Sequence, residues 1–171
     1  ALVDPDAGQL VDRLVPPVSE SYKAVQSVAF SRDGSRLAVG AKDGTLRIWS
    51  VGRRALEGTY IGQAEGASRW INGVTFVGPD QVATAGADGT LRLRDVANGR
   101  ERAVFHGATG PLTAVVASPS GERLLTVSSD GSCRSWDLVA LAPERRTWAV
   151  EENVFSLAFH RDGRLAVTAG W

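Results

Sequence analysis

One eight-residue pattern occurs three times in the chain and constrains the fold more than any other feature. The copies begin with Asp-Gly at Asp43, Asp88 and Asp130, so their spacing is 45 and then 42 residues. A second apolar pattern precedes each copy and also follows the last one, at residues 27–30, 73–76, 114–117 and 156–159. A repeat of this length indicates a fold built from one small unit used several times, in which each unit packs against its neighbours.

Each repeat predicts four short antiparallel strands. Apolar residues alternate or run in short blocks, β-branched residues are frequent, and Gly, Asp, Asn or Pro interrupts the pattern at intervals typical of tight turns. The Asp-Gly dipeptides supply the positive φ that a tight hairpin needs. In the first full repeat we expect strands at 25–30, 36–40, 45–49 and 56–61. The predicted fold class is therefore all-β.

These blocks resemble the WD-repeat β-propeller family over nearly the whole chain. The resemblance rests on Asp-Gly-Thr-Leu-Arg-Ile-Trp at 43–49, on Ser-Val-Ala-Phe-Ser-Arg-Asp-Gly at 27–34 and on Trp-Asp at 136–137. It implies four-stranded antiparallel blades, each with its first strand lining a central channel and its fourth strand on the rim. The style of these repeats also suggests a bacterial signalling protein, in which a kinase or NTPase module often accompanies the propeller.

The resemblance also implies a set of buried polar side chains in each blade. Thr84 and Thr126 match its hydroxyl position, and the turn Asp residues match its carboxylate position. Trp49 and Trp136 match its indole position, so we expect both to be buried, whereas Arg94 replaces the third Trp and is expected to be exposed.

Family repeats usually begin with Gly-His, and that histidine is absent here. The dipeptides that we match to it are Gly66-Ala67 and Gly107-Ala108. The repeats are therefore degenerate, and none keeps the full polar set.

The pattern predicts one propeller segment of about four blade equivalents, arranged as a half blade, three whole blades and another half blade. The expected bounds are an outer half blade at 1–15, blades at 22–62, 70–106 and 111–150, and an inner half blade at 154–171. An amphipathic helix ended by Pro16-Pro17 is the competing interpretation of residues 9–15.

The two half blades leave three arrangements open. The chain is a piece of a longer propeller, it closes as a ring of four blades, or two copies share their split blades. Since an unpaired sheet edge must find a partner, we expect a two-fold homodimer of about eight blades.

Composition and motifs argue against several functions. The 19 basic and 19 acidic residues leave no surplus of positive charge, so we expect neither a nucleic-acid nor a membrane partner. The single cysteine excludes an internal disulfide, and no zinc, phosphate-loop or nucleophile-elbow motif occurs. We therefore expect a cytoplasmic, non-enzymatic chain with no catalytic residue, metal or cofactor.

The resemblance implies a platform for binding other proteins, with one face built from positions at the start of each first strand and from the residue before each turn Asp. Trp70 is the most informative of these, because an exposed aromatic side chain is typical of a binding hot spot; covering a seam between blades is its alternative role. The other expected partner-binding residues are Asn72, Lys42, Gln26, Thr113, Asn153, Phe155 and Trp171. The predicted function is a non-catalytic protein–protein interaction scaffold, and the alternative is a structural repeat block for self-assembly.

Overall fold

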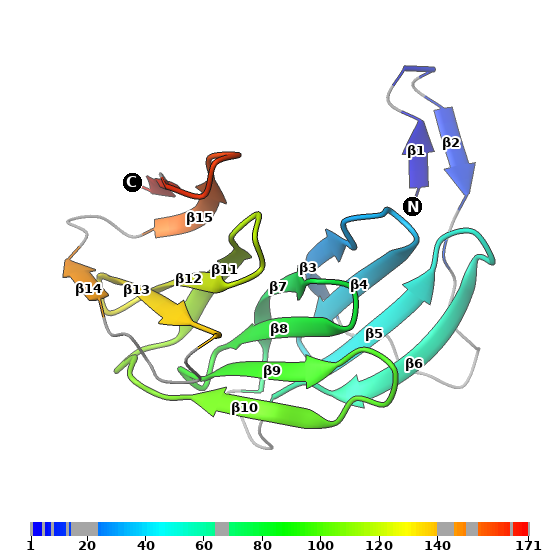
Figure 1. Ribbon diagram of the computed structural model, residues 1–171. Helices are drawn as coiled ribbons and strands as arrows, with labels where there is room; N and C mark the ends of the chain where they lie inside the picture. Colours follow the sequence, from blue (N-terminus) through cyan, green and yellow to red (C-terminus); the bar gives the residue numbers. More distant parts are fainter. Residues whose placement is uncertain are drawn as a thin grey trace.

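The computed structural model describes residues 2–4, 6–7, 9–12, 14, 24–63, 69–139, 146–149, 154–164 and 166–170. The regular structure in these residues consists of β-strands joined by turns (Figure 1). Residues 9–12 form a strand, so the helical interpretation of that segment is wrong. Over the described ranges no helix has the length and apolar character needed to cross a membrane.

Three four-stranded antiparallel sheets follow one another along the chain, and they confirm the predicted all-β blade architecture. Blade 1 consists of β3 (Val25–Phe30), β4 (Arg36–Ala41), β5 (Thr45–Ser50) and β6 (Ala55–Ile61). Blade 2 consists of β7 (Ile71–Val77), β8 (Gln81–Gly86), β9 (Leu91–Asp95) and β10 (Glu101–Phe105). Blade 3 consists of β11 (Leu112–Ala117), β12 (Arg123–Ser128), β13 (Ser132–Asp137) and β14 (Arg146–Ala149).

Two-stranded sheets flank the three blades. β1 (Leu2–Asp4) pairs with β2 (Gln9–Asp12), and β15 (Val154–Phe159) pairs with β16 (Ala166–Gly170). Figure 1 shows the sheets following one another around an open arc, with β1 and β2 at one end and β15 at the other. First strands of neighbouring blades contact each other from β3 through β7 and β11 to β15.

The hairpin between the second and third strands of each blade is fixed by the repeated Asp-Gly pattern. In blade 1, Asp43 Oδ1 accepts hydrogen bonds from Thr45 N at 2.9 Å and from Thr45 Oγ1 at 2.5 Å, and Gly44 has a φ of 81°. An arginine four residues after each Asp closes the turn with an ion pair. The N–O distances are 3.5 Å for Arg47–Asp43, 3.6 Å for Arg92–Asp88 and 3.3 Å for Arg134–Asp130.

Apolar side chains between successive sheets form the core. Leu46 and Ile48 of blade 1 pack with Val74 and Phe76 of blade 2. The same arrangement recurs between blades 2 and 3 and between blade 3 and β15. Because each sheet buries its faces against its neighbours, a surface that lacks a neighbour leaves the equivalent side chains exposed.

The indole position of the repeat confirms two expectations and contradicts a third. Trp49 and Trp136 are buried, and Trp136 Nε1 donates a hydrogen bond to Thr126 Oγ1 at 2.9 Å. Arg94 was expected to be exposed, which is wrong, because it is only 9% exposed. Glu101, directly opposite Arg94 on β10, accepts a hydrogen bond from its Nη2 at 2.7 Å and so compensates the buried charge.

The position of the missing histidine is filled in blade 2 by Gln63. Gln63 is fully buried; its Nε2 donates to Thr84 Oγ1 at 3.0 Å, and its Oε1 accepts from Thr90 Oγ1 at 3.0 Å. The expected dipeptide, Gly66-Ala67, lies outside the described residues, so its own role stays a prediction. A glutamine side chain both donates and accepts hydrogen bonds, which lets it link the same polar groups.

Candidate protein-interaction surface

One face of the blades carries the turn Asp residues and the starts of the first strands, and we call it the top face. A backbone hydrogen bond ties these two features together in every blade. The residue before the turn Asp donates its N–H to the residue before the first strand: Lys42 to Ala24 at 3.0 Å, Ala87 to Trp70 at 2.9 Å and Ser129 to Pro111 at 2.9 Å. The backbone of Trp70 is therefore held by the same bond that fixes the other blades.

The side chain of Trp70 is exposed on this face, with 43% of its surface accessible. Lys42 of blade 1 places its Nζ 4.4 Å from the centroid of the indole ring, which is the geometry of a cation–π contact. Trp70 therefore lies at the boundary between blades 1 and 2. It contacts blade 1 across this seam and is also exposed to solvent.

The charged groups near Trp70 differ in whether they form ion pairs. Each turn Asp forms an ion pair with the arginine of its own turn. Burial alone would raise the pKa of Asp43, but hydrogen bonds from Thr45 and the charge of Arg47 outweigh burial and hold this pKa below its usual value. Within the described ranges, Lys42 and exposed Arg69 form no ion pair. Lys42, the cation that contacts the indole, thus has less charge compensation than the acids of the turns.

Asn72 and Thr113 make interblade contacts with their polar groups. Asn72 Nδ2 donates to Leu112 O at 2.8 Å, and Thr113 Oγ1 donates to Val154 O at 2.7 Å. Both side chains are half-buried, so they tie neighbouring first strands together as well as lying near the top face. Gln26 is exposed at the start of β3.

Comparison with known proteins gives the fold a family. The family model described as "WD domain, G-beta repeat" matches residues 17–50 and 99–137. A guanine nucleotide-binding protein subunit beta from Nicotiana plumbaginifolia is 30% identical over 161 residues, covering 86% of this chain and 41% of that protein. The chain belongs to the WD-repeat β-propeller family.

Two further relatives are named for other roles. A ribosome biogenesis protein from Chaetomium globosum is 30% identical over 163 residues, covering 80% of this chain and 34% of the relative. A mouse U3 small nucleolar RNA-associated protein 4 homolog is 26% identical over 144 residues, covering 81% of this chain and 20% of the relative. This WD-repeat chain thus spans less than half the length of these relatives.

Three of the predicted site residues are not placed on the surface by the structure. Asn153 and Trp171 lie outside the described residues, and Phe155 lies within β15 without a described side chain. Their roles in binding stay predictions.

The sequence pattern did not predict some of the exposed apolar side chains. Val28 and Phe30 of β3 are 58% and 56% exposed, although the equivalent Val74 and Phe76 of β7 are buried against blade 1. The sequence places the same residue types in both strands, so only the arrangement of sheets in the structure distinguishes them.

The described residues offer little for catalysis or metal binding. Among them, no group of three or more His, Cys, Asp and Glu side chains could hold a metal ion. Cys133 is buried, and burial raises the pKa of its thiol, which disfavours the reactive thiolate. His160 Nδ1 lies 2.9 Å from Asp162 Oδ1 in an exposed turn.

Proposed function

We propose that this WD-repeat chain is a non-catalytic, cytoplasmic scaffold that binds other proteins through the top face around Trp70. The observation that carries the proposal is an indole held in place by its backbone and left 43% exposed beside a cation. Aromatic side chains in such positions dominate many protein interfaces. The family supports a role in protein interaction, and the charges of Lys42 and Arg69 favour a partner segment that carries carboxylates beside apolar residues.

Trp148 provides a matched control for a binding test. It lies on β14 at the rim of blade 3 and is 46% exposed, so it resembles Trp70 in residue type and accessibility but not in location. Proteins captured by the immobilised chain would be quantified by mass spectrometry for wild type, Trp70→Ala and Trp148→Ala. We expect Trp70→Ala to weaken binding by more than about 1 kcal/mol, or at least fivefold, and Trp148→Ala to retain it. Equal loss in both variants, or no loss in Trp70→Ala, would contradict the proposal.

Self-assembly is a second candidate function, favoured by the exposed end face of blade 1. Val28 and Phe30 present there the same surface that Val74 and Phe76 bury elsewhere. In this arrangement β15 and β16 of a second copy would cover the face and complete the blade that β1 and β2 begin. Sedimentation should then give a dimer for the wild type and a monomer for the Val28→Asp, Phe30→Asp double variant. A monomeric wild type would exclude this candidate.

We propose that the chain binds neither nucleic acids nor membranes. The balance of 19 basic and 19 acidic residues supports this expectation, and the RNA association in the name of one relative makes it worth testing. Titration of a labelled single-stranded RNA oligomer at physiological salt should give no binding with micromolar affinity. Tight, salt-sensitive binding would contradict it.

A further inference from the structure

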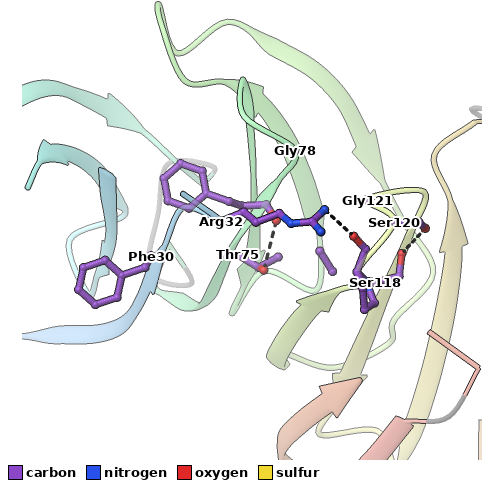
Figure 2. A pocket seen from close by; sticks show the side chains of 10 residues that line it. Phe30, Arg32, Thr75, Gly78, Ser118, Ser120 and Gly121 are labelled. Carbon is purple, nitrogen blue, oxygen red and sulfur yellow. Dashed lines mark hydrogen bonds between the residues drawn. The ribbon is translucent and has the colours of Figure 1, made fainter. Parts of the chain in front are cut away.

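A small cavity lies at the end of the blades opposite the top face, among the turns that follow β3, β7 and β11 (Figure 2). Its volume is about 280 Å³. That is slightly below the range of roughly 300–1,000 Å³ typical of sites for small molecules and cofactors. The cavity therefore suits a short chemical group, such as one amino-acid residue.

The cavity has an apolar part and a polar part. Its apolar walls include Phe30, Phe76 and Ala117, which come from three successive blades. Its polar part includes Arg32, Ser118 and Ser120. A ligand that fits this lining needs an apolar group and an anionic or hydrogen-bonding group close together.

Arg32 reaches across the turn of blade 2 to blade 3. Its Nη1 donates a hydrogen bond to Pro119 O at 3.3 Å, and Figure 2 shows the side chain extended between Gly78 and Ser118. Arg32 has five N–H donors and is exposed, so the single bond to Pro119 leaves most of its donors available.

The acid next to Arg32 is engaged elsewhere. Asp33 Oδ1 accepts a hydrogen bond from Ser31 Oγ at 2.6 Å, and Asp33 Oδ2 accepts one from Ser35 Oγ at 2.8 Å. The bond from Ser31, followed by those from Ser35, lowers the pKa of Asp33 to about 2. Arg32 itself forms no ion pair within the described ranges.

Two serine hydroxyls complete the polar part. Ser118 Oγ and Ser120 Oγ lie 3.2 Å apart and share one hydrogen bond, as Figure 2 shows. Since one hydroxyl hydrogen serves that bond, the other is left to donate. The polar part of the cavity thus combines a guanidinium and a hydroxyl donor, both suited to a carboxylate.

We propose that this cavity, which we call the base pocket, binds the C-terminal residue of a polypeptide. The terminal carboxylate pairs with the Arg32 guanidinium and a serine hydroxyl, and an apolar last side chain packs against half-buried Ala117 and exposed Phe30. A single cation suits one carboxylate, whereas a polyanion such as RNA would need several. The base pocket lies away from Trp70, so this inference does not depend on the proposed top-face surface, whereas a dimer that covers Phe30 would close one wall of the pocket.

The probe is the peptide Gly-Ser-Gly-Ser-Gly-Leu with a free C-terminus, compared with the same peptide carrying a C-terminal amide. Titration would be followed by two-dimensional amide NMR of the full chain, because a one-residue contact gives weak affinity. We expect the free acid to shift the amide signals of Gly78 and Gly121, and to bind about tenfold more tightly than the amide. Sodium acetate and inorganic phosphate, added separately, would show whether an anion alone occupies the pocket.

Arg32→Gln should weaken binding of the free acid about tenfold and leave binding of the amide unchanged. Arg53→Gln is the matched control, because Arg53 is an exposed arginine paired with Glu57 at the rim. Retained amide dispersion would verify that each variant is folded. Equal affinity for acid and amide, equal binding by Arg32→Gln and wild type, or saturation by acetate or phosphate as tight as by the peptide would overturn the proposal.

Discussion

Trp136 and Trp70 are the same residue type in two regions of the molecule, with opposite surroundings. Trp136 is 2% exposed, packs against Phe105 with a ring-centroid distance of 5.3 Å, and satisfies its indole N–H with Thr126. Trp70 is 43% exposed and contacts Lys42. Packing and hydrogen bonding inside the blades explain why a tryptophan occupies position 136. They do not explain the exposed surface of Trp70.

Blade 2 has other residues at two interior positions of the family pattern. It lacks both the tryptophan and the histidine of the family pattern, yet Arg94 with Glu101 and Gln63 with Thr84 occupy those positions with hydrogen bonds. The interior of blade 2 therefore accommodates different residues with most of their polar groups paired, while Arg94 Nε is buried without a hydrogen-bond partner. The exposed part of the Trp70 indole fills no such interior volume, and this is why we propose that it serves binding.

The largest expected effect is the loss of Trp136. Trp136→Ala should lower the free energy of unfolding by about 3–5 kcal/mol, because it leaves a cavity between blades 2 and 3. Denaturant unfolding followed by circular dichroism would measure this. Trp136→Phe keeps most of the ring but removes the bond to Thr126, so its loss should be smaller. A change below about 1 kcal/mol in Trp136→Ala would show that the blade interior has been misassigned.

Gln63 tests whether a polar set is needed in blade 2. Gln63→Leu should lower the free energy of unfolding by about 2 kcal/mol, because it leaves the buried hydroxyl of Thr90 and the guanidinium of Arg92 without this acceptor. Gln63→His introduces the residue of the family and should lower it less. Both would be measured by the same unfolding assay. Equal stability of Gln63→Leu and wild type would mean that the polar set contributes nothing.

A smaller effect is expected at Glu101, which compensates Arg94. Burial lowers the pKa of Arg94, and the carboxylate of Glu101 opposes that shift. Glu101→Gln should lower the free energy of unfolding by about 1 kcal/mol, a modest value because Glu101 is one-third exposed. Glu122→Gln, an exposed acid without an ion pair among the described residues, serves as the control. If the two variants lose the same stability, the charge of Glu101 has no specific role.

The features that could be predicted from the sequence are those set by residues close together in the chain. The strands and hairpins follow from alternation and Asp-Gly turns within a few residues, so the blade pattern was predictable. The burial of Arg94 was not, because Glu101 meets it only through the cross-strand register of β9 and β10. Gln63 acts in the blade after its own, and the base pocket joins turns of three blades. Such contacts depend on how sheets pack, which no single repeat encodes.

The most direct test of the account is one variant, Trp70→Ala, measured for both stability and binding. Because much of the indole is already in solvent, its removal should change the free energy of unfolding by less than about 1 kcal/mol. The same variant should lose binding to captured partner proteins by more than about 1 kcal/mol. A loss of stability near that of Trp136→Ala, with partner binding retained, would instead make Trp70 a packing residue and contradict the proposed interaction surface.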